Sequence, residues 1–151
     1  MQVRIDMLGT AVTELHQMEA RLGNMLPAWT EAGEILVASV AKNFAAGGRP
    51  RWPKRAEERE GELGHVSGAL QASTESFPDQ QGVTVASRLP YSATFQYGRQ
   101  SGRGAPIPAR PFIVCQREDE KAIAETIANY ITGASARSIR RGLIATYGVG
   151  E

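Results

Sequence analysis

The chain has 151 residues, of which 42% are hydrophobic and 22% charged, and its formal net charge is +1. This length suits one domain that buries roughly two thirds of its unfolded surface, and the composition excludes a disordered or fibrous chain. The small net charge excludes a global field that would draw the protein onto nucleic acid, and the longest apolar runs, such as residues 35–38, are too short to cross a membrane, so we expect a soluble, cytosolic product.

A stripe of apolar side chains predicts the first helix, over residues 7–25. Its members are spaced by alternating threes and fours, as one face of an α-helix requires: Leu8, Ala11, Leu15, Met18, Leu22 and Met25. The stripe is narrow, as in a helix that packs against one other helix. It either covers the chain's own core, which is the commoner arrangement, or packs on another subunit.

A second helix is predicted over residues 28–46, where apolar side chains again recur at helical spacing. Pro27 breaks the first helix, Thr30 can cap the second, and Gly47 begins the glycine pair that stops it. We therefore expect residues 7–46 to fold as a helical hairpin.

Residues 47–66 are predicted to form an extended loop. They consist mainly of prolines, glycines and charged residues and contain almost no apolar side chain that could be buried. A basic run is followed directly by an acidic cluster, which favours a solvated loop over a nucleic-acid site. Long loops of this kind are often ordered by a partner. Trp52, between Arg51 and Pro53, is the expected anchor.

Residues 67–114 form the expected β-rich part of the chain. A turn cluster at residues 78–82 precedes the alternating residues 83–88, which predicts a β-hairpin. Pro90 is suited to the first position of a short helix, and we expect Tyr91 and Phe95 to share its buried face.

That short helix ends at Gly98, and a polar loop follows it. Residues 110–114 then predict a short strand, which Pro111 places at an edge of the sheet.

Residues 117–147 predict the C-terminal helices. The first, over residues 117–132, is closed by Gly133. The last begins at Ser135 and combines an apolar face with several arginines, as a terminal docking helix does. The whole chain, residues 1–151, is thus predicted to be a single α+β domain, with an N-terminal helical hairpin and C-terminal helices packed on a small antiparallel sheet.

No constellation of reactive groups points to catalysis. Cys115 is the only cysteine, which excludes a disulfide within the chain and a thiolate-rich metal site, and it follows an apolar run where a buried thiol is expected. His16 and His65 are far apart in sequence, and we expect both to be solvated. We expect no catalytic residue, no metal and no cofactor, and hence no enzyme.

A DNA-binding module is the alternative interpretation. Arg99, Arg103 and Arg110, together with Tyr97, could line a path for nucleic acid, because phosphate contact needs only accessible cations. The basic run near Arg51 and the basic last helix would serve the same purpose. An enzyme, such as a peptidase or nuclease, ranks below both interpretations.

An ordered series of short motifs resembles the virion-morphogenesis, or tail-completion, family of Mu-like and P2-like tailed phages. The resemblance covers about residues 30 to 132. It consists of Phe44, Gly47, Pro50 and Trp52, of Ser67-Gly68-Ala69-Leu70-Gln71-Ala72-Ser73, of Tyr91-Ser92, Gln96 and Gly98, and of Ile107-Pro108-Ala109-Arg110-Pro111-Phe112. Ser67 stands where the family usually has Thr, Ser92 replaces Ala, and residues 54–62 carry more charge than the family pattern. Order and spacing, more than any single motif, carry the resemblance.

The resemblance implies a noncatalytic structural protein of the virion neck, made in the host cytoplasm, that completes tails or joins them to heads. Its station as tail terminator, head-tail connector or assembly factor stays open. By analogy with other neck components, the resemblance implies a homo-oligomeric ring, for which we expect a hexamer. Its partners would be neighbouring neck and tail proteins, with passing contact to phage DNA and none to a membrane.

We expect the interface to use the anchored loop, the edge-compatible strands and the amphipathic ends of the chain. Trp52 is expected to fill a pocket on an adjacent subunit when the loop orders. The candidate interface residues are Pro50, Arg51, Trp52, Tyr97, Arg110, Phe112, Arg140, Arg141 and Tyr147.

Overall fold

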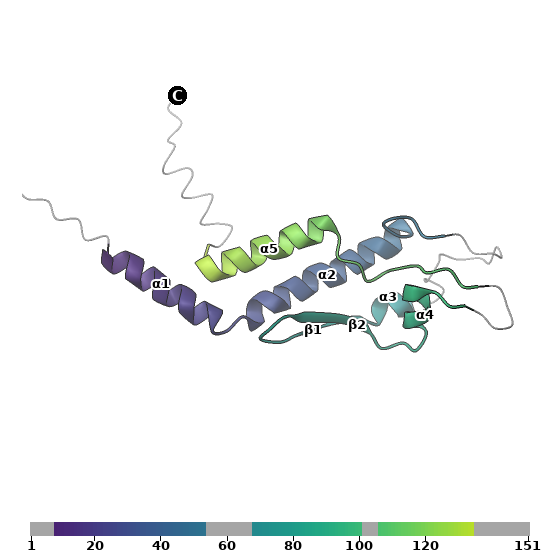
Figure 1. Ribbon diagram of the computed structural model, residues 1–151, viewed down its shortest axis with the longest axis horizontal. Helices are drawn as coiled ribbons and strands as arrows, with labels where there is room; N and C mark the ends of the chain where they lie inside the picture. The colour runs from purple at the N-terminus through teal and green to yellow at the C-terminus, as the bar shows by residue number, and fades with distance from the viewer. Residues whose placement is uncertain (1–7, 54–67, 101–105, 135–151) are drawn as a thin grey trace, which may run out of the picture.

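The structure is a computed structural model that describes residues 8–53, 68–100 and 106–134 (Figure 1). Its elements in chain order are helices α1 (Leu8–Leu22), α2 (Leu26–Ala46) and α3 (Ala69–Ala72), strands β1 (Thr74–Pro78) and β2 (Val83–Ser87), and helices α4 (Ser92–Tyr97) and α5 (Arg117–Thr132). The predicted α+β class is confirmed. The predicted last helix lies outside the described residues, and among those described no helix is long and apolar enough to span a membrane.

The long helix α2 is the centre of the fold, with α5 along one side and the sheet along the other (Figure 1). Pro27 lies in the first turn of α2, where a missing N–H costs nothing, whereas α1 already ends at Leu22, before the expected break at Pro27. The expected cap at Thr30 does not form, because its hydroxyl lies inside the helix and donates to the Leu26 carbonyl at 2.8 Å. Gly47 ends α2 in the left-handed conformation, as predicted.

The first two helices do not form the expected packed hairpin. Helix α1 continues away from the start of α2 and contacts the end of α5 instead (Figure 1). The reason is that α5 and β1 already cover the apolar sides of α2, which leaves no face for α1. In place of the expected hairpin, the chain therefore has one central helix, α2, and one projecting helix, α1.

The predicted β-hairpin is confirmed, with β1 and β2 paired antiparallel from Thr74 opposite Ser87 to Pro78 opposite Val83. The Asp79 carboxylate accepts hydrogen bonds from the backbone N–H groups of Gln81 and Gly82, which fixes the turn.

The hairpin packs closely on α2 at Gly33. A Cβ at this position would lie 2.7 Å from the Ser76 Cβ and 3.0 Å from a methyl group of Val83. Only glycine lets the helix and the sheet approach this far.

Four aromatic rings form the centre of the core. The ring of Phe44 lies 5.3 Å from Trp52 and 5.6 Å from Phe112, between ring centroids, and Phe95 contacts Trp52 edge-on at 5.3 Å. Such edge and tilted arrangements add to the stability gained from burial. The core therefore joins α2, α4 and two segments without regular structure.

The strand predicted at residues 110–114 is not formed. The Gln96 side chain takes the place of a strand partner: its Oε1 accepts from the backbone N–H groups of Phe112 and Ile113, and its Nε2 donates to the Ile113 carbonyl. Among the described residues, no strand lies beside this segment to pair with it. The expected pairing of Tyr91 with Phe95 is also wrong, because Tyr91 precedes α4 and is exposed while Phe95 packs on the core.

Helix α5 has the predicted bounds. Asp119, in its first turn, accepts a hydrogen bond from the backbone N–H of Gln116, and Gly133 ends the helix in the left-handed conformation. The apolar spacing and the closing glycine predicted these bounds, whereas the cap at Asp119 was not predicted.

Candidate interface surfaces

The described residues contain no group of histidine, cysteine and carboxylate side chains that could hold a metal ion. His16 is exposed on α1, while His65 lies outside the described residues. Cys115 is exposed, which corrects the expectation of a buried thiol: the fully buried apolar side chain of this segment is Phe112.

A partly buried polar cluster joins α2, the loop that follows it and α5. The Arg49 guanidinium donates to the Asn43 side-chain carbonyl at 2.8 Å and to the Ser39 hydroxyl at 2.7 Å, and it pairs with Glu118. The Ser39 hydroxyl in turn donates to Asp119 at 2.5 Å. Among the described residues no buried side-chain nitrogen or oxygen lacks a hydrogen-bond partner, so the buried atoms of this cluster are all engaged within the fold.

Trp52 belongs to the core of its own chain, with 5% of its surface exposed. Its indole N–H donates to the Pro111 carbonyl at 2.9 Å, and its ring packs on Phe44 and Phe95. The expectation that this side chain fills a pocket on an adjacent subunit is therefore wrong. The loop is anchored by Trp52, but to the same chain.

Two other interface candidates are also buried. Phe112 lies in the same aromatic core, and Arg110 donates from its Nε to the Pro53 carbonyl at 3.1 Å. Arg110 therefore does not join Arg99 in an exposed row of cations, and Arg103 lies outside the described residues.

The remaining candidates lie at the surface or beyond the described ranges. Pro50, Arg51 and Tyr97 are exposed, and Tyr97 shows 79% of its surface. The expected roles of Arg140, Arg141 and Tyr147 fall outside the described residues.

The apolar stripe of α1 is not covered by the chain's own core. Leu15 is 63% exposed and Leu22 56% exposed, and Val12 is exposed between them and the start of the helix. The commoner arrangement, in which such a stripe covers its own core, is thus not the one found. These leucines were absent from our interface candidates, although their narrow stripe was the signal that could have found them.

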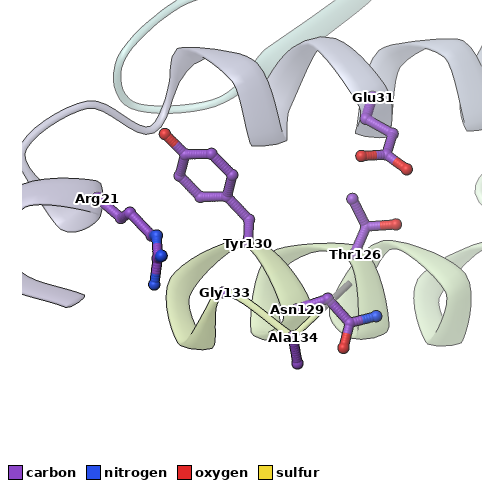
Figure 2. Close-up of a pocket in the computed structure, with 7 residues that line it drawn as sticks. All are labelled: Arg21, Glu31, Thr126, Asn129, Tyr130, Gly133 and Ala134. Atoms are coloured by element: carbon purple, nitrogen blue, oxygen red, sulfur yellow. The ribbon is translucent and has the colours of Figure 1, made fainter. Parts of the chain in front are cut away.

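Helix α1 is attached to the body at its C-terminal end. Arg21 donates to the Ile131 carbonyl at 3.1 Å, and the Tyr130 hydroxyl donates to the Asn24 carbonyl at 2.6 Å. A cleft of about 450 Å³ lies at this junction, between Arg21, Glu31 on α2 and Asn129 on α5 (Figure 2). This cleft marks where α1 leaves the body.

A second group of exposed apolar side chains lies at the other end of the described fold. The backbones of Arg99 and Ile107 pair after α4, which brings Tyr97 and Ile107 to the surface beside Arg99. Helix α4 and this pairing lie at the opposite end from α1 (Figure 1). One chain therefore carries different apolar surfaces at its two ends.

Comparison with known proteins identifies the family. Residues 4–132 match the phage virion morphogenesis family. The chain is 30% identical over 131 residues to "Mu-like prophage FluMu G protein 2" of Haemophilus influenzae, which covers 85% of this chain and 94% of that protein. The comparison with solved structures found no match. The match covers the aromatic core, the sheet and helices α1 to α5 of the described residues, and the chain belongs to the phage virion morphogenesis family.

Proposed function

We propose that this protein is a structural component of the phage neck, which completes the tail or joins it to the head and acts by assembling into a ring of identical copies. Membership of the family gives it a role in building the phage virion. Its position in the neck and its assembly into a ring are our inference from the exposed surfaces of the chain.

The uncovered apolar face of α1 is the observation that carries the proposal. An isolated helix of 15 residues is only marginally stable in water. Because Leu15 and Leu22 are exposed in the single chain, a neighbour that covers them would stabilise α1 and remove apolar surface from water.

Two different apolar ends favour contact from head to tail. The α1 end of one copy would meet the Tyr97 and Ile107 end of the next, and such heterologous contacts close into a ring when the rotation per copy divides a full turn. We propose a hexamer, whose outer surfaces contact neighbouring neck and tail proteins and whose channel passes phage DNA.

DNA binding remains the second candidate, and it has less support from the described residues. Arg51 and Arg99 are exposed cations, but Arg49 and Arg110 are engaged within the fold. A DNA-binding module would bind duplex DNA with strong dependence on salt concentration.

Sedimentation velocity and negative-stain electron microscopy test the proposal. Rings of the purified protein, together with its detection in purified phage particles by mass spectrometry, are the expected results. A monomer at all concentrations, absent from particles, would overturn the proposal, and salt-dependent DNA binding by that monomer would favour the alternative.

A further inference from the structure

Strand β2 has a free edge. In the antiparallel pair, Asp79 donates from its backbone N–H to the Gly82 carbonyl, so Phe77 opposite Thr84 and Glu75 opposite Ala86 are the next hydrogen-bonded pairs. The backbone groups of the alternate residues therefore point away from β1. On β2 these are Val83, Val85 and Ser87, whose outward N–H and C=O groups make no hydrogen bond within the described residues.

The edge of β1 is less suited to pairing than that of β2. Pro78 is one of its outward residues and has no N–H to donate, whereas β2 contains no proline. A free strand edge with all its donors is a template for another strand. Of the two strands, only β2 therefore has an outer edge on which every residue has a backbone N–H to donate to another strand.

A cleft of about 290 Å³ lies beside the second half of β2. Its lining includes Val85, Ala86 and Ser87 on the strand, Ala93 and Gln96 on α4, and Phe112. An added strand could direct side chains into this cleft while its backbone pairs with β2.

We propose that residues 1–7 of a second copy of this chain add to the free edge of β2 as a third strand. This inference rests on the proposed self-assembly and names the contact that would make it. Residues 1–7 alternate between apolar and polar side chains, the pattern of a strand with one buried face: Met1, Val3, Ile5 and Met7 against Gln2, Arg4 and Asp6. Seven extended residues span roughly 23 Å, enough to cover the five residues of β2.

The side chains on the sheet fit this arrangement. With Val3 and Ile5 directed to the cleft, Arg4 and Asp6 would lie on the outer face of the sheet. That face already carries Glu75 and Arg88, which pair at 2.8 Å. Glu75 offers a negative charge to Arg4, and Arg88 offers a positive charge to Asp6.

The length of residues 1–7 favours pairing with β2 of another copy over pairing with β2 of the same chain. The turn before β2 contacts the segment that joins α1 to α2, where the Met25 N–H donates to the Gln80 side chain at 3.1 Å. Residues 1–7 precede the other end of α1, about 22 Å away along a helix of 15 residues that points away from the body (Figure 1). Returning over that distance would use nearly all of their length, so little would remain to pair with their own β2.

Disulfide trapping between copies tests the inference. In a Cys115→Ser background, chains with Arg4→Cys or Asp6→Cys are mixed with chains that carry Ala86→Cys, whose side chain lies on the outer face of the sheet. Mild oxidation should give a crosslinked dimer of the two variants. The matched control is Ala124→Cys, an exposed alanine on α5, which should give none.

The outcomes separate this contact from self-assembly in general. Adding Ile5→Pro to the Arg4→Cys chain should abolish the crosslink, because proline removes a strand donor. A ring that forms without any crosslink from Ala86→Cys, or equal crosslinking to Ala124→Cys, would overturn the strand exchange and leave the proposed function standing. A crosslink confined within one chain carrying both cysteines would overturn it as well.

Discussion

The Ser39 hydroxyl donates a hydrogen bond of 2.5 Å to the Asp119 carboxylate, which joins the middle of α2 to the first turn of α5 across 80 positions of sequence. Both side chains are buried, and the same carboxylate oxygen accepts the backbone N–H of Gln116. One side chain therefore caps α5 and fixes its position on α2. The loop after α2 depends on it too, since Arg49 donates to the same Ser39 hydroxyl.

Asp119→Ala should lower the free energy of unfolding by about 2 kcal/mol, because it leaves a buried hydroxyl and a helix N-terminus without their acceptor. Urea unfolding followed by circular dichroism measures the change. Glu125→Ala, an exposed substitution on the same helix, is the control and should have almost no effect. Equal stability of the two variants would contradict the role of Asp119.

Trp52→Ala should destabilise the fold itself by about 3–5 kcal/mol, the usual range for removing a large buried aromatic side chain. Trp52→Phe should retain more stability and lose chiefly the hydrogen bond to the Pro111 carbonyl. The neighbouring exposed substitution Arg51→Ala is the control. If Trp52→Ala unfolds at the wild-type temperature and affects only oligomerisation, Trp52 is an interface residue after all.

Gly33→Ala should destabilise the protein by about 1–3 kcal/mol, because the new methyl group must separate α2 from Ser76 and Val83. Gly82→Ala is a matched control, since a Cβ there would meet nothing within 4 Å. Thermal unfolding of both variants compares them directly. A stability gain from Gly33→Ala would show that the helix and the sheet are not in close contact.

The thiol of Cys115 should react slowly although it is exposed. Partial burial raises its pKa, and the nearby carboxylates of Asp119 and Glu120 raise it further, so less of the reactive thiolate is present at mildly alkaline pH. Alkylation by iodoacetamide should be slower in the folded chain than in urea, and Glu120→Gln should accelerate it while Glu125→Gln does not. Equal rates in the folded and unfolded chains would contradict the raised pKa.

The raised pKa of Cys115 also determines how the free energy of unfolding changes with pH. A thiol whose pKa is higher in the folded than in the unfolded state holds its proton longer when folded. The contribution to stability is fully present below the unfolded pKa, and it falls as the pH rises from there through the folded pKa.

Local signals located most of the elements. The helix ending at Gly47, the helix between Gln116 and Gly133, and the turn at Asp79 each depend on residues close in sequence, and the structure has all three. The helical spacing of apolar side chains likewise predicted α1, but this spacing does not show which part of the protein or of a partner covers those side chains.

Contacts between distant residues could not be predicted in the same way. The pairing of Gln96 with Phe112 and Ile113 replaces a strand by a side chain, and no alternation of residues signals this. The burial of Trp52 depends on Phe95 and the Pro111 carbonyl, which lie far along the chain. A tryptophan in a charged loop resembled an interface anchor because its pocket is built from other segments.

Sedimentation velocity of the Leu15→Glu variant beside the wild-type chain tests self-assembly through α1 most directly. Leu15 is exposed in the single chain, so the fold should survive, while a charge in the covered face of α1 should prevent association. Gln17→Glu adds the same charge at an exposed polar position of the same helix and is the control. We predict a ring-sized species for wild type and Gln17→Glu and a folded monomer for Leu15→Glu; a Leu15→Glu chain that sediments with the wild type would contradict the account.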